Sequence, residues 1–99
     1  MGRLAPKIDA NQPEIVAALR AVGVSVQSLA SVGGGCPDLL CAVNTMNFII
    51  EAKMPGERLN PRQKSWHRDW RGRAHIAYNV EQALNIAAMY RDFGKPFPM

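Results

Sequence analysis

The sequence predicts a small α/β protein in which a mixed β-sheet is flanked by helices, in the order α-β-β-β-α-β-α. Apolar residues recur at helical spacing in three segments, and four shorter apolar segments bounded by turn-forming residues are typical of strands. Three strands in a meander, followed by a helix that crosses over to a fourth strand, form a sheet of mixed direction. With 99 residues the chain has room for a single domain, spanning residues 1–99.

The first helix is expected over residues 14–22, where apolar side chains recur at i, i+4 and i+7. Asp9 or Asn11 can cap this helix, and Pro13 suits its first turn, where a missing N–H costs nothing. Residues 24–30 are expected to form the first strand, which ends at three consecutive glycines. Glycines permit positive φ angles and carry no side chain, so another backbone can approach closely at this point.

Residues 38–43 and 48–53 are expected to form a β-hairpin. A hairpin symmetric about residues 45–46 pairs Asp38 with Lys53 and places the three charged residues of the hairpin on one face. The other face is then wholly apolar and consists of Leu39, Cys41, Val43, Phe48, Ile50 and Ala52. A slip of one residue would mix polar and apolar side chains on both faces, so the pattern favours this arrangement.

A second helix is expected over residues 62–71, because Asn60 can cap it and Pro61 suits its first position. Trp66 and Trp70 lie four residues apart on one face of this helix. Tryptophans at that spacing are typical of packing against a sheet, more than of stacking on nucleobases. We therefore expect this face of the helix to contribute to the core.

The last two elements are a strand over residues 75–79 and a helix that Asn79 caps. Gln82 stands three residues after Asn79, which is the spacing of a capping box. This helix is expected to end at Gly94.

The formal net charge is +4, and the positive excess lies between residues 58 and 73. A basic segment of this kind suits a polyanion such as a nucleic acid, although a solvated helix face gives the same pattern. The candidates for contacts with phosphates are Arg58, Arg62, Lys64, Arg68 and Arg71.

The composition also indicates the cellular compartment of the protein. Cys36 and Cys41 are too few for a zinc site or a disulfide framework, so we expect free thiols in a reducing environment. The sequence contains no apolar run long enough to span a bilayer and does not begin with a signal-peptide pattern. These features predict a cytoplasmic protein with no membrane partner.

The shared face of the hairpin would bring two carboxylates and one ammonium to a single point. Mg²⁺ binds carboxylate oxygens, so Asp38 and Glu51 are candidate ligands, and the Ala52 backbone carbonyl is a third. Metal-bound water is a better nucleophile toward a phosphodiester, and Lys53 would orient that water or stabilise charge on the phosphate. The alternative is a surface ion pair on a hairpin.

These residues also resemble a known nuclease motif. Pro37-Asp38 followed by Glu51-Ala52-Lys53 resembles the PD-(D/E)xK motif. The longer pattern adds an acid in the first helix and the segments GGGCPDLL, FIIEAK and LNPRQK. Over about residues 14–88 this pattern resembles the VRR-NUC domain, in particular its stand-alone members from bacteriophages and bacteria.

The resemblance implies a restriction-endonuclease-like fold and cleavage of DNA that depends on Mg²⁺ or Mn²⁺. Asp38, Glu51 and Lys53 match the three central positions of the motif. Gln63 matches the family's glutamine, and Glu14 matches its first-helix acid. Without the resemblance, Gln63 would be interpreted as a capping or loop-bracing residue and Glu14 as an acid that interacts with the helix dipole. Stand-alone members resemble Holliday-junction resolvases, which implies a homodimer acting on branched DNA in a bacterial or phage-infected cell.

Two other functions fit parts of the sequence. A non-catalytic nucleic-acid-binding module would use the basic residues alone and would bind DNA in a salt-dependent way without cleaving it. A sequence-specific restriction-type enzyme would need readout loops, for which 99 residues leave little room. The leading hypothesis is a metal-dependent, structure-selective DNA endonuclease.

Overall fold

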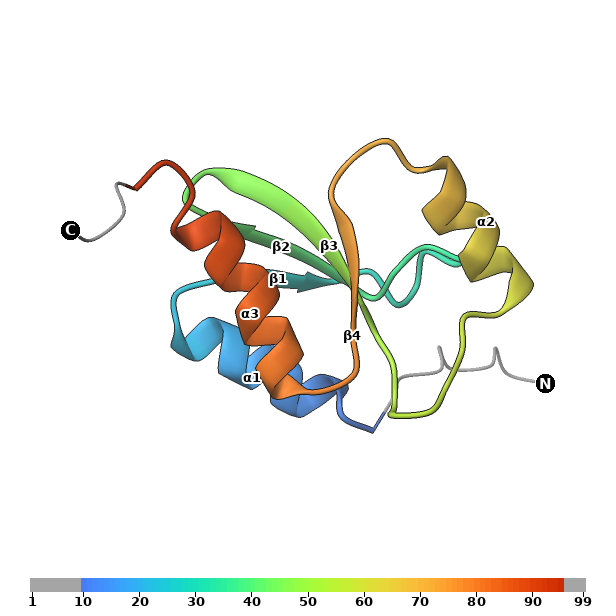
Figure 1. The fold of residues 1–99 in the computed structure, drawn as a ribbon. Helices are drawn as coiled ribbons and strands as arrows, with labels where there is room; N and C mark the ends of the chain where they lie inside the picture. Colours follow the sequence, from blue (N-terminus) through green and yellow to red (C-terminus); the bar gives the residue numbers. More distant parts are fainter. Residues whose placement is uncertain (1–9, 96–99) are drawn as a thin grey trace.

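A computed structural model describes residues 10–95 and confirms the α/β fold and the order of its elements (Figure 1). In chain order these elements are α1 (Gln12–Ala21), β1 (Ser25–Ser28), β2 (Leu39–Val43), β3 (Met46–Ala52), α2 (Pro61–Asp69), β4 (Ala74–Ala77) and α3 (Val80–Arg91). Within the described residues, no helix is both long and apolar enough to cross a membrane.

The four strands form one mixed sheet in the order β1-β2-β3-β4. The first three strands pair antiparallel, and β4 returns through α2 to pair with β3 in parallel, as predicted. Figure 1 shows α1 and α3 side by side on one face of the sheet, whereas α2 stands apart from this helical layer. The molecule therefore has two layers plus one helix outside them.

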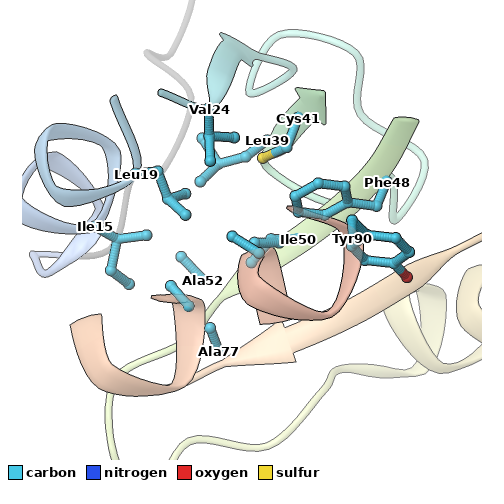
Figure 2. Packing of buried hydrophobic residues seen from close by; sticks show 12 residues of the cluster. Ile15, Leu19, Val24, Leu39, Cys41, Phe48, Ile50, Ala52, Ala77 and Tyr90 are labelled. Atoms are coloured by element: carbon cyan, nitrogen blue, oxygen red, sulfur yellow. The ribbon is translucent and has the colours of Figure 1, made fainter. Parts of the chain in front are cut away.

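The core lies between the sheet and the helices α1 and α3 (Figure 2). Of the face predicted to be apolar, five residues are at most 1% exposed, and these are Leu39, Cys41, Phe48, Ile50 and Ala52. Ile15 and Leu19 of α1 close this face, together with Tyr90 of α3, whose ring stacks on Phe48 at 4.4 Å between centroids. The prediction that this face of the hairpin is apolar and buried is thus confirmed for these five residues.

The register of the hairpin differs from the prediction by two residues. Asn44 and Thr45 alone make the turn, with φ angles of 53° and 60°, and β3 already begins at Met46. Two central residues with positive φ define the tight turn that matches the twist of a hairpin. The Asn44 side chain holds the turn by donating to the backbone carbonyls of Tyr90 and Phe93 at 3.0 and 3.3 Å.

This shorter turn pairs Leu39 with Ile50, so the residue opposite Asp38 is Glu51 and not Lys53. A shift by two residues leaves every side chain on its face, because side chains alternate with a period of two. The charged residues therefore still share one side of the sheet.

The helices start at the predicted cap residues, but the hydrogen bonds of the caps differ in two cases. Asn11 stands at the N-cap of α1 and makes no side-chain hydrogen bond to the helix. Asn60 and Gln63 form a complete capping box at α2. At α3 the Asn79 side chain accepts from the Gln82 N–H at 2.8 Å, but the Gln82 side chain accepts from Tyr78 N–H and so reaches one residue further back. Asp9, the alternative cap for α1, lies outside the described residues.

The prediction that the tryptophans of α2 enter the core is wrong. No residue of α2 is buried, and Trp70 remains 47% exposed. Trp66 and Trp70 stack on each other, with ring centroids 4.7 Å apart and an interplanar angle of 16°. Spacing along a helix shows that two rings share a face, but whether a sheet covers that face depends on tertiary structure.

Candidate active site

Asp38 lies where the pairing of β2 with β3 stops. Its Oδ2 atom accepts the Ala52 backbone N–H at 2.9 Å. If the strand register continued, Pro37 would stand opposite Ala52, and proline has no N–H to give to the ladder. The Ala52 N–H is therefore taken by a side chain, and strand β2 supplies no donor for the Ala52 carbonyl. This end of the sheet thus offers a carboxylate and a backbone carbonyl beside each other.

Glu51 lies in β3 and Lys53 follows the end of this strand, so strand alternation places their side chains on the same face as Asp38. They are only 2% and 8% exposed, and Lys53 also donates its backbone N–H to the Ala77 carbonyl of β4 at 3.0 Å. Charged side chains are rarely buried unless they are compensated, because desolvating a charge is costly. Glu51 and Lys53 are therefore not solvated on the surface of the hairpin.

The Cys36 thiol shows that both acids act on the same region. Burial raises its pKa first, and the charges of Glu51 and Asp38 raise it further. One thiol therefore experiences the negative potential of both carboxylates. Cys41, by contrast, lies in the core, and burial alone raises its pKa to about 12.

Two residues at the start of α1 belong to this region and were not identified from the sequence. The Asn11 side chain donates to the backbone carbonyls of Lys53 and Tyr78, both at 3.0 Å, and so ties α1 to the ends of β3 and β4. Gln12 is 5% exposed, and its Oε1 atom is buried without a hydrogen-bond partner. Its spacing from Ile15 and Leu19, at i, i+3 and i+7, is the signal that it faces inward.

Glu14 is not brought to the other candidates. It is exposed on α1, and two residues from the inward-facing Gln12 it lies about 200° around the helix axis. An acid in the first turn of a helix interacts favourably with the helix dipole in any case. Glu14 thus occupies an exposed position that stabilises the helix, and the buried polar side chain in the first turn of α1 is that of Gln12.

Gln63 lies at the start of α2, against the glycine loop that leads to Asp38. Its Oε1 atom accepts a hydrogen bond from the Asn60 N–H at 2.9 Å, so the side chain stabilises the start of the helix. A side chain at Gly35 would come within 2.4 Å of the Arg62 carbonyl oxygen and 3.0 Å of the Gln63 nitrogen. The expected close approach of another backbone therefore occurs at Gly35, and the first turn of α2 makes it.

The predicted phosphate-binding residues are all exposed on α2 and its flanks; they are Arg58, Arg62, Lys64, Arg68 and Arg71. Arg68 forms an ion pair with Asp69 at 2.8 Å, and its hydrogen bonds lower the pKa of that carboxyl. Within the part of the chain that the structure describes, none of the other four phosphate-binding candidates forms an ion pair. The other four are exposed cations on α2 and its flanks.

The donor set suits a hard cation. Within residues 10–95 no group of three or more histidine, cysteine or acidic side chains is arranged to hold a metal. Mg²⁺ needs fewer protein ligands, because it keeps several waters and takes one or two carboxylates together with substrate phosphate. Asp38, Glu51 and the Ala52 carbonyl meet that requirement.

Comparisons of the chain with family models, with curated proteins and with solved structures found no match in any of the three. The fold and the site define an α/β protein with a buried acid–lysine cluster at the end of its sheet. Its function is inferred from that cluster and its surroundings.

Proposed function

We propose that this protein is a metal-dependent DNA endonuclease. One observation supports this most strongly: Glu51 and Lys53 are buried next to each other on the face that carries Asp38. Two acids and a lysine are a costly arrangement for stability alone. They are the groups required to hold a divalent cation and to neutralise a phosphate in its transition state.

The carboxylates of Asp38 and Glu51 and the carbonyl of Ala52 would hold Mg²⁺ or Mn²⁺. When bound, the ion supplies an activated water and stabilises charge on the phosphate. The Ala52 N–H fixes the Asp38 carboxylate through Oδ2, which leaves its other oxygen for the cation. Lys53 carries a compact charge that orients water or stabilises the oxygen atoms of the phosphate.

Branched DNA and a homodimeric enzyme are part of the same proposal. The exposed cations of α2 and its flanks provide contacts for phosphates, which position DNA without reading its sequence. A single small domain with one site would cut one strand, so paired cuts at a junction require two copies. Sedimentation at micromolar concentration should show a dimer, and a strict monomer would contradict this part.

The central experiment incubates the protein with a four-way junction, a flap and a linear duplex, with and without Mg²⁺ or Mn²⁺. We expect metal-dependent cuts near the branch point. Asp38→Asn and Lys53→Ala should each lower the rate by at least about a hundredfold, while junction binding in Ca²⁺ persists. Glu81→Gln, at an exposed acid of α3, is the matched control and should cut like the wild type.

Two outcomes of this experiment are informative, and one further variant adds to them. Metal-dependent cleavage that survives in both site variants would contradict the assigned site. Salt-dependent binding without cleavage under any condition would favour the non-catalytic binding module instead. Glu14→Gln separates the family resemblance, which implies loss of cleavage, from the exposed position of Glu14, which implies none.

A further inference from the structure

The stacked tryptophans of α2 border an open hollow on the surface. Its volume is about 570 Å³, and its walls include Arg62 and Trp66 of α2, Trp70 directly after this helix, and Gly34 of the glycine loop. Gly34 has no heavy atom within 4 Å of where a side chain would begin, so this wall is open. The hollow thus combines aromatic walls with free space.

The charge around this hollow is positive. Arg62 lines it, and Lys64 and Arg71 are exposed on the same helix or just after it. Asp69 also lines it, but the guanidinium of Arg68 holds that carboxylate through two hydrogen bonds of 2.8 and 3.1 Å. A cationic or a purely apolar partner is therefore poorly matched to this surface.

We propose that the hollow binds an unpaired nucleobase of DNA, with the base against the indole rings and its phosphates on the neighbouring cations. Stacking on aromatic side chains beside a cationic groove is the general way in which proteins hold single-stranded nucleic acid. Bases inside a duplex are already stacked on each other, so this site selects single-stranded or splayed segments. The choice of DNA as the ligand rests on the proposed nuclease function.

The position of the hollow relates it to the candidate active site. Gly34 precedes Asp38 by four residues, so a fully extended chain spans at most about 14 Å between them. One strand rises about 3.4 Å per stacked nucleotide, which makes this distance about four nucleotides. The Gly34 wall of the hollow therefore lies within about four nucleotides of Asp38.

Intrinsic fluorescence tests the proposal without labels, because Trp66 and Trp70 are the only tryptophans of the chain. The measurement uses the Asp38→Asn background without divalent metal, so that the DNA stays intact. Oligothymidylate should quench the emission, and a blunt duplex of the same length should quench it much less. Equal quenching by both, or none with oligothymidylate, would overturn the proposal.

Variants of Trp70 test whether its indole ring is responsible for the binding of oligothymidylate. Trp70→Ala should lower the affinity for oligothymidylate by about fivefold to a hundredfold and leave duplex affinity unchanged, whereas Trp70→Phe should retain most of it. Phe93→Ala, which removes an exposed ring at the far end of α3, is the matched control and should bind like the parent. Thermal unfolding checks that Trp70→Ala folds, which its exposure favours.

The remaining outcomes separate this site from the nuclease proposal. If Trp70→Ala keeps its affinity for oligothymidylate but changes from dimer to monomer in sedimentation, the hollow is a contact between copies and the proposal is wrong. If base binding fails while Asp38-dependent cleavage persists, only this inference is lost. If Trp70-dependent binding is found in a protein that cuts no DNA, the base site stands and the nuclease function does not.

Discussion

Asn11 offers a direct test of how the end of the sheet is held together. Its side-chain amide donates to the carbonyls of Lys53 and Tyr78 at 3.0 Å each, and the residue is only 7% exposed. Replacing Asn11 with alanine removes both donors. Each hydrogen bond contributes about 1 kcal/mol net, and a buried carbonyl left without a donor costs about 1–3 kcal/mol. Water can reach part of the gap, so we expect Asn11→Ala to lower the free energy of unfolding by about 1–3 kcal/mol.

Asn11→Asp is the sharper variant, because it keeps the shape of the side chain and turns both donors into acceptors. A carboxylate facing two carbonyls should cost about 3 kcal/mol or more, so aspartate should be worse than alanine. Thermal unfolding measures the order directly, and for a domain of this size 1 kcal/mol corresponds to about 4–8 °C. If Asn11→Asp unfolds at the wild-type temperature, the amide does not tie α1 to the two strands.

The remaining predictions concern the glycine loop and the pH dependence of stability. Gly33 and Gly35 both have positive φ angles, but of the two only Gly35 would bring a side chain against the Arg62 carbonyl. In urea titration, Gly35→Ala should therefore lower the free energy of unfolding by at least about 1 kcal/mol more than Gly33→Ala does. Equal costs would mean that α2 moves away freely. Burial lowers the pKa of His75 below its ordinary 6.5, so below that pH the unfolded state binds more protons and stability should fall. His75→Gln removes the titrating group together with its hydrogen bond to Tyr90, so the loss of stability at low pH should be smaller in this variant. Urea midpoints of both proteins above and below pH 6.5 measure this loss, and an equal loss in both would contradict the assignment to His75.

The faces of the hairpin could be predicted from the sequence because they depend only on alternation. A period of two survives a shift of two residues, which is why the apolar set was right while the partner of Asp38 was wrong. The turn length decided the register, and the signal for it, Asn44 in the left-handed region, is weakened by the β-branched Thr45 that follows.

Other features had no local signal. The hydrogen bonds of Asn11 join residues 42 and 67 positions apart, so no sequence pattern around Asn11 encodes them. Trp66 and Trp70 were placed on the correct common face, but the path of the chain after β3 keeps that face away from the sheet. Local periodicity fixes which side chains stand together, and the packing of distant elements decides what covers them.

The separation of α2 from the core has a consequence for how this protein can change over time. Because none of its residues is buried, substitutions on this helix do not disturb the packing of α1 and α3 on the sheet. The close approach of its first turn to Gly35 limits how α2 is placed. A helix with few packing constraints can change its surface residues with little loss of stability, so relatives of this protein should share Asp38, Glu51 and Lys53 and differ most in the residues of α2 that do not line the hollow.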